Sequence, residues 1–149
     1  MLVGVPKEIK NHEYRVAITP AGVVEFVKNG HQVVVEKNAG VGSAISDDEY
    51  VKAGAKILDS SDEVWAKSDL ILKVKEPIAA EYPKMRKDQI LFTYLHLAAS
   101  KDCTDALIKS GTTAIAYDLF SSSTVSYAIA VVPDFIKASV QSFDAAKCR

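Results

Sequence analysis

Short strand-like segments alternate with helical segments over the first two-thirds of this 149-residue chain, and this alternation restricts the fold more than any other feature. Strands that alternate with helices at these lengths predict right-handed crossovers and a parallel sheet. The predicted fold class is therefore α/β: an open, mostly parallel sheet with helices on both faces, of the Rossmann-like or flavodoxin-like kind. The expected strands are 2–5, 31–37, 56–58, 70–75, 89–95 and 112–117, and the expected helices are 19–30, 47–55, 60–68 and 100–111.

Residues that favour helix ends stand where these helices should begin or end. Thr19 can cap the first helix and Gly30 can end it. Ser46 and Glu49 have the spacing of a capping box at the start of the second helix. Gly111 can close the fourth helix. These local signals support the helix assignments independently of the apolar pattern.

The composition is that of a soluble globular domain, with 48% hydrophobic and 25% charged residues. A net charge of -1 gives no electrostatic reason to expect nucleic acid or an anionic membrane as a partner. No apolar run approaches the roughly 20 residues of a membrane span, and the N-terminus lacks the pattern of a secretion signal. The two cysteines, Cys103 and Cys148, lie far apart, so a reduced, cytoplasmic setting is expected.

The expected strand 70–75, LILKVK, carries Lys73 and Lys75 at its C-terminal end. Side chains of a strand alternate between its two faces, so both lysines should point the same way. In open parallel sheets, ligands bind outside the carboxyl ends of the strands. Arg15 follows the first expected strand and His96 follows the strand after LILKVK. Arg15, Lys75 and His96 are therefore predicted to meet at one edge of the sheet.

Each of these three side chains also has an ordinary explanation as a surface or loop residue. Their convergence favours a binding site, because cations that gather without an anion repel one another. Arg15 offers a planar fork that matches a carboxylate, Lys75 adds a point charge, and His96 can exchange protons near neutral pH. Two groups that hold an anion and one that moves a proton suit a small carboxylic acid that reacts beside its carboxylate.

Three other features of the sequence do not predict a binding or catalytic site. The segment GVGSAI (40–45) begins like a dinucleotide fingerprint, but Ile45 stands where the third glycine belongs, so nucleotide binding is not expected there. His12 and His31 lack partners at ligand spacing, and no metal site is predicted. The serine-rich segment 121–124 has no nearby base and is interpreted as a loop.

Four segments resemble a known family. GVPKEIKNHEYRVAITPAGV, NAGVGSAISDDEYVKAGA, LILKVKEP and ILFTYLHLAAS are similar, in this order, to the N-terminal region of bacterial alanine dehydrogenases. The similarity extends from Met1 to about Tyr117. The alpha subunit of nicotinamide nucleotide transhydrogenase shares this domain, but its counterpart of the LHLAAS segment lacks the histidine, which favours the dehydrogenase.

The resemblance implies a two-domain enzyme that interconverts L-alanine and pyruvate plus ammonium with NAD. It implies that Arg15 and Lys75 bind the substrate and that His96 is the catalytic proton donor and acceptor. Lys73 is expected to be a supporting or a rim residue, outside the catalytic set. A homo-oligomer is implied for the full-length family.

The family pattern stops near residue 119. We therefore expect a domain at 1–118 and a divergent tail at 119–149 that forms a strand and a helix. No GxGxxG occurs in the chain, so the NAD-binding Rossmann domain is expected to be absent, and this fragment alone should neither bind NAD nor turn over substrate. Two alternatives stay open: a non-catalytic module that binds carboxylates or another protein, and a domain of the transhydrogenase alpha type.

Overall fold

The structure, a computed structural model, describes residues 1–97, 99–117, 130 and 131. The chain divides into two compact units, Met1–Lys75 and Glu76–Arg149. The first unit therefore ends directly after the lysine pair of the LILKVK segment. The domain boundary predicted after residue 118 falls outside the described residues and stays a prediction.

The first unit is built on parallel strands in the order β3-β2-β1-β4. Val3 of β1 pairs with Val33 of β2 on one side and with Leu70 of β4 on the other. The strand β1 therefore lies between β2, the next strand along the chain, and β4, which is added later on its other side. The strand bounds are Leu2–Val5 for β1, Gln32–Glu36 for β2, Lys56–Leu58 for β3 and Leu70–Leu72 for β4.

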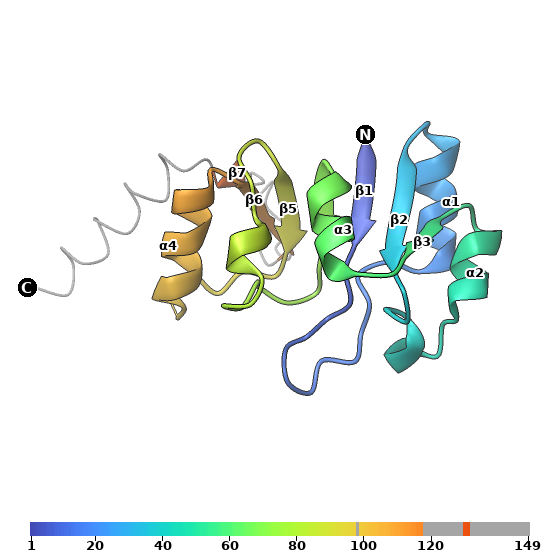
Figure 1. Cartoon of the computed structure of the whole chain (residues 1–149), viewed down its shortest axis with the longest axis horizontal. Coiled ribbons are helices and arrows are strands. Elements are labelled where there is room, and N and C mark those ends of the chain that lie inside the picture. Colours follow the sequence, from blue (N-terminus) through green and yellow to red (C-terminus); the bar gives the residue numbers. More distant parts are fainter. Residues whose placement is uncertain (98, 118–129, 132–149) are drawn as a thin grey trace, which may run out of the picture. The chain divides into compact units, whose positions relative to one another are not determined.

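The helices of this unit lie on both faces of its sheet. The chain adds β2 and β3 on one side of β1 and then crosses to β4 on the other side, and such a reversal places the crossover helices on opposite faces. In Figure 1, α3 lies in front of β1, whereas α1 lies behind β2. The helix bounds are Pro20–Lys28 for α1, Asp47–Lys52 for α2, Ser61–Lys67 for α3 and Val41–Ser43 for the short 3-10 helix η1.

The predicted caps are confirmed. Thr19 accepts a hydrogen bond from the backbone N–H of Gly22 at the start of α1. Ser46 and Glu49 form the complete capping box of α2, in which Glu49 Oε2 accepts from the Ser46 backbone N–H at 2.8 Å. These contacts satisfy helix N–H groups that would otherwise lack partners.

The strand β4 ends earlier than the sequence predicted. It stops at Leu72, and the chain bends at 74 and 75 instead of continuing as a strand. The backbone N–H of Val74 donates to a side chain, Glu8 Oε1, at 2.7 Å. Because that donor is used by a carboxylate, it does not extend a strand ladder. The alternation argument for Lys73 and Lys75 therefore does not apply across this segment.

The second unit contains β5 (Ile90–Thr93) parallel to β6 (Thr113–Ala116), and β7 (Ala130–Val131) antiparallel to β6. It also contains the 3-10 helix η2 (Tyr82–Lys84) and helix α4 (Lys101–Ser110). Gly111 adopts a left-handed φ of 72° at the end of α4, as the sequence predicted. The remainder of the predicted tail at 119–149 lies outside the described residues.

The predicted α/β class with parallel strands and covering helices is confirmed, and the short β7 is the antiparallel exception. The core of the first unit is formed mainly by its central strands. Val3, Val5 and Val35 are fully buried, and so are Val64 and Tyr50 from the helices. Within the described residues, no helix has the length and apolar character needed to cross a membrane.

Candidate functional site

The candidate site lies at the edge of the first unit where β1 and β4 end. β1 is the strand at which the order of chain addition reverses, because β2 and β4 lie on opposite sides of it. Open α/β sheets bind ligands at such a reversal, outside the carboxyl ends of the strands. In Figure 1 the long loop after β1 extends beyond this edge.

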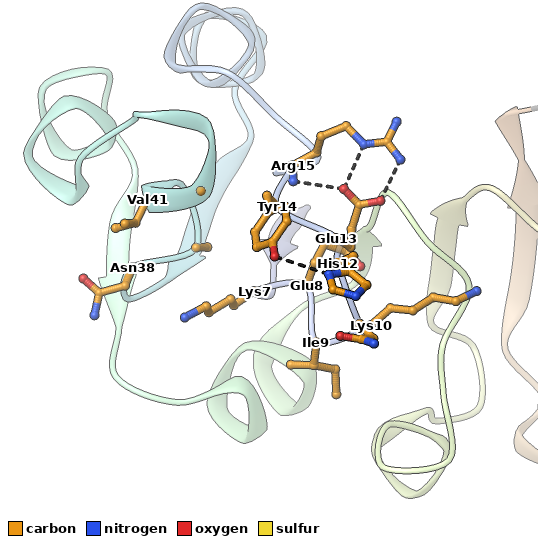
Figure 2. A pocket seen from close by; sticks show the side chains of 13 residues that line it. Lys7, Glu8, Ile9, Lys10, His12, Glu13, Tyr14, Arg15, Asn38 and Val41 are labelled. Atoms are coloured by element: carbon orange, nitrogen blue, oxygen red, sulfur yellow. Dashed lines mark hydrogen bonds and ion pairs between the residues drawn. The ribbon is translucent and has the colours of Figure 1, made fainter.

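A hollow of about 480 Å³ is formed by this loop together with the segment after β2. Figure 2 shows its side chains, which carry both charges and apolar groups. The hollow thus has several cations near its rim and carboxylates among them. Its lining residues are Lys7, Glu8, Ile9, Lys10, Asn11, His12, Glu13, Tyr14, Arg15, Asn38, Ala39, Val41 and Gly42.

A tight turn shapes the loop next to Arg15. The backbone N–H of Glu13 donates to the Lys10 carbonyl at 3.1 Å, and His12 in this turn has a left-handed φ of 59°. The His12 Nδ1 lies 3.5 Å from the Tyr14 hydroxyl. Glu13 and Arg15 stand at the end of this turn, and both line the hollow.

The short helix η1 holds the same loop from the other side. Ser43 Oγ donates to the Tyr14 carbonyl at 3.2 Å. A Cβ on Gly42 would collide with that carbonyl, so the close approach requires glycine. The GVGSAI segment, which sequence reasoning treated only as a weak nucleotide motif, therefore has a packing role beside the candidate site.

Arg15 forms a two-pronged ion pair with Glu13. Its Nε donates to Glu13 Oε1 at 2.8 Å and its Nη2 to Oε2 at 2.6 Å, while its backbone N–H also donates to Oε1 at 3.0 Å. The Glu13 side chain is only 7% exposed, whereas that of Arg15 is 60% exposed. The carboxylate is thus the fixed, inner partner and the guanidinium the outer one (Figure 2).

Lys75 acts electrostatically on the same carboxylate. The side-chain hydrogen bonds from Arg15 lower the pKa of Glu13 from 4.5 to about 2, although burial opposes this shift. The charge of Lys75 adds to the lowering of the Glu13 pKa. Arg15 and Lys75, which the sequence placed at one edge of the sheet, therefore both influence Glu13 within the first unit.

Lys73, the other lysine of the pair, is buried in an ion pair. Its Nζ lies 3.1 Å from Glu8 Oε2, and the two side chains are 1% and 2% exposed. The second oxygen of Glu8 accepts the Val74 backbone N–H. Glu8 thereby joins the loop after β1 to the end of β4, two residues before Lys75. Lys73 therefore does not lie at a rim, and its supporting role stays a prediction.

His96 belongs to the second unit, in the segment that follows β5. His96 is exposed, and its carbonyl accepts the backbone N–H groups of Ala99 at 2.9 Å and Ser100 at 3.1 Å. The predicted meeting of Arg15, Lys75 and His96 consequently stays a prediction. Sequence reasoning missed Glu13 and Glu8, and the only available signal was their position in the loop between a strand and Arg15.

The described residues do not form a dinucleotide cradle in the segment that came closest to such a motif. Gly42 is packed against the Tyr14 carbonyl, and η1 is a single turn that ends at Ala44 with a left-handed φ of 58°. The helix that follows, α2, carries Asp47, Asp48 and Glu49 in its first turn, and carboxylates there disfavour a phosphate. Among the residues that the structure describes, no cluster of three or more potential metal ligands occurs.

Fold and site together define the class: an open parallel α/β domain whose charged loop stands at the reversal point of the sheet. The chain belongs to the family described as Alanine dehydrogenase/PNT, N-terminal domain, whose model matches residues 4–132. The resemblance to alanine dehydrogenases that the sequence motifs indicated is thereby confirmed.

Curated relatives carry the same domain. Alanine dehydrogenase of Mycolicibacterium smegmatis is 64% identical over 118 residues, which are 79% of this chain and 32% of that protein. Alanine dehydrogenase of Bacillus subtilis is 50% identical over 121 residues, which are 81% of this chain and 32% of that protein. The chain spans about a third of the length of these relatives.

Solved structures agree with this assignment. An L-alanine dehydrogenase aligns with a TM-score of 0.78 and 50% identity, covering 80% of this chain and 33% of that one. A transhydrogenase from Sinorhizobium meliloti aligns with a TM-score of 0.75 and 33% identity, covering 80% and 34%. Both proteins contain the domain, and the sequence identity is higher with the dehydrogenase.

Proposed function

We propose that this chain supplies the substrate-binding part of an NAD-dependent L-alanine dehydrogenase, which converts L-alanine, NAD and water to pyruvate, ammonium and NADH. One observation supports the proposal most: Arg15 and Lys75 both act on a carboxylate, that of Glu13, at the edge where β1 and β4 end. A guanidinium that already binds one carboxylate, with a second cation acting on the same group, has the chemistry to bind a carboxylate of the substrate.

The proposed roles follow from the chemistry of the three side chains. Arg15 binds the substrate carboxylate with its guanidinium, which is 60% exposed and thus accessible. Lys75 supplies a positive charge near the carbonyl or amine carbon. His96 exchanges the proton that the reaction releases or takes up, because an imidazole can both donate and accept a proton.

NAD supplies the hydride acceptor of this reaction, and the sequence contains no GxGxxG motif that would bind it. Hydride transfer requires the nicotinamide to be held against the substrate carbon. The proposal therefore assigns substrate binding and proton transfer to this chain and assigns no cofactor contact to it. We expect that the chain alone does not turn over. A reduced, cytoplasmic setting and a homo-oligomeric full-length enzyme belong to the same proposal.

Two other functions are compatible with the fold. A domain of the transhydrogenase type is the second candidate, because the chain also aligns with a transhydrogenase. The sequence identity is 33% with that protein and 50% with the L-alanine dehydrogenase. A binding module without catalysis is the third. His96 distinguishes the alanine dehydrogenase candidate from the transhydrogenase candidate. A proton-exchanging group at this position suits alanine dehydrogenation. The sequence resemblance implies that the corresponding segment of the transhydrogenase lacks this histidine.

Calorimetric titration of the purified chain with pyruvate tests the proposed binding roles. Arg15→Ala should weaken pyruvate binding by about 1.5–3 kcal/mol, the scale of a hydrogen bond to a charged group. His96→Ala should leave it largely intact, because the histidine is proposed to move a proton rather than to hold the carboxylate. Equal losses from both substitutions would contradict this division of roles.

A turnover assay separates a substrate-binding part from an independent enzyme. NADH oxidation with pyruvate and ammonium, followed with the purified chain, should give no rate above the background. NAD-dependent turnover by this chain would show that the assignment of no cofactor contact is wrong. Pyruvate binding without turnover supports the proposal, and absence of pyruvate binding removes it.

A further inference from the structure

We propose that Glu13 is a positioning residue of the anion site: it fixes the orientation of the Arg15 guanidinium through a two-pronged ion pair. The inference deepens the proposed function and rests on it for the identity of the anion, pyruvate. No sequence motif and no relative's name assigns a role to this carboxylate.

The geometry of the pair carries the first step. Both oxygens of Glu13 engage the Nε and Nη2 edge of Arg15 at 2.8 and 2.6 Å, and Oε1 also accepts the Arg15 backbone N–H. A planar carboxylate bound along one edge of a guanidinium fixes the plane and direction of that group. An arginine side chain otherwise carries about 2 kcal/mol of rotamer entropy, part of which a fixed partner removes before ligand binding.

The unequal burial of the pair carries the second step. Glu13 is 7% exposed and sits in the turn closed by its own backbone N–H, so its carboxylate has a fixed position. Arg15 is 60% exposed. A surface ion pair between two exposed side chains contributes little, but here one partner is buried, and the buried carboxylate determines where the exposed guanidinium lies.

The charge balance carries the third step. Two cations that share one anion site repel each other while no ligand is bound. Arg15 and Lys75 both lower the pKa of Glu13, which therefore carries its negative charge at neutral pH. In the ligand-free chain, the charge of Glu13 offsets part of the repulsion between the two cations. The substrate carboxylate then meets an Arg15 guanidinium that is already oriented.

Side-chain NMR of the arginines measures the orientation directly. The chain contains three arginines, Arg15, Arg86 and Arg149, so its Nε–H signals are few, and Arg15→Lys assigns one of them by its loss. The Arg15 Nε–H should exchange slowly with water in the native chain and clearly faster in Glu13→Gln and Glu13→Asp. An unchanged Arg15 signal in both variants overturns the proposal.

Pyruvate affinity separates positioning from charge alone. Glu13→Asp keeps the charge but shortens the reach, whereas Glu13→Gln removes the charge. If Glu13 positions Arg15, both variants should bind pyruvate about 3- to 10-fold more weakly, where tenfold equals about 1.4 kcal/mol. If Glu13 acts only by its charge, Glu13→Asp should match the native chain and Glu13→Gln should bind pyruvate more tightly, and this result overturns the proposal.

Two controls keep the result specific. Glu63→Gln removes an exposed ion pair of similar length, to Lys67 at 2.6 Å within α3, and should change neither readout. In an Arg15→Lys background, the Glu13 substitutions should no longer affect pyruvate affinity; an undiminished effect there overturns the positioning role. If the native chain binds no pyruvate, the proposed function fails, while the Arg15 Nε–H signal still decides whether Glu13 orients the guanidinium.

Discussion

Glu8 and Lys73, which are 65 residues apart in the sequence, form an ion pair that is almost completely removed from water. The Nζ–Oε2 distance is 3.1 Å, and the second oxygen of Glu8 accepts the Val74 backbone N–H at 2.7 Å. One carboxylate thus joins the loop that carries Arg15 to the end of the strand that leads to Lys75. The two substrate-binding side chains proposed here are connected through a buried contact between their supporting segments.

Breaking this pair from one side should be costly. Glu8→Gln leaves the Lys73 ammonium buried opposite a neutral amide, and removing one partner of a buried pair typically costs about 3–5 kcal/mol of unfolding free energy. The double variant Glu8→Gln/Lys73→Met removes both charges and should recover much of that loss. Urea unfolding of the native chain and the variants measures this.

An exposed pair provides the matched control for that experiment. Glu63→Gln breaks the surface pair with Lys67 and should change the unfolding free energy by at most about 0.5 kcal/mol. A Glu8→Gln variant that is as stable as Glu63→Gln would show that the buried pair does not support the loop.

Gly42→Ala should disturb the loop that carries Arg15. The added Cβ collides with the Tyr14 carbonyl, a backbone atom that can move only with the loop. Overpacking of this kind costs about 1–3 kcal/mol of unfolding free energy. Pyruvate affinity should fall as well, because the loop moves. Thermal unfolding and pyruvate titration measure the two effects.

Ser43→Ala is the comparison for Gly42→Ala, because it removes only the 3.2 Å hydrogen bond to the same carbonyl. It should cost about 0.5–1.5 kcal/mol of unfolding free energy and leave pyruvate binding close to that of the native chain. Equal behaviour of the two variants would mean that the glycine is not needed for the close approach.

Tyr50 should make stability fall at alkaline pH. Its hydroxyl donates to the Ile18 carbonyl at 2.7 Å in the core, and burial, with Asp47 and Glu49 adding to it, raises its pKa from 10.0 to about 12. A raised folded-state pKa contributes stability that is complete below pH 10.0 and is lost as the pH rises towards about 12. Unfolding measured from neutral to alkaline pH should show a larger loss in the native chain than in Tyr50→Phe, because burial also raises the pKa of Tyr82 and this contribution is common to both proteins.

The Tyr50→Phe variant also has an expected effect at neutral pH. It leaves the Ile18 carbonyl without this donor, and its unfolding free energy should be lower by about 1–2 kcal/mol. The difference between the two proteins should then shrink at alkaline pH. A difference that stays constant throughout would contradict the assignment of the alkaline loss to Tyr50.

Glu13 should have the opposite signature at acidic pH. Its pKa is lowered from 4.5 to about 2 by the hydrogen bonds from Arg15, so it contributes stability above pH 4.5 that is lost as the pH falls towards about 2. Glu13→Gln lacks this contribution. The stability difference between the native chain and Glu13→Gln should be constant near neutral pH and decrease in this acidic window, as acid-dependent denaturant unfolding would record.

The sequence alone determined the elements and their order. The alternation of strands and helices predicted the parallel α/β sheet, and the caps at Thr19, Ser46 and Gly111 are present as expected. These signals are local: a cap joins residues within one helical turn, and its chemistry can be recognised from spacing. The family motifs likewise identify the domain from the sequence alone.

Only the tertiary structure decided how the charged residues are used. Spacing predicted that Lys73 and Lys75 point to the same side of one strand. Instead, β4 ends at Leu72, where Glu8 from a distant loop accepts the Val74 N–H and pairs with the buried Lys73 ammonium. The pairing of Glu13 with Arg15 likewise follows from the folded loop and not from a recognised spacing. The physical reason is that burial and ion pairing depend on segments brought together by folding, whereas a sequence pattern reports only on neighbours along the chain.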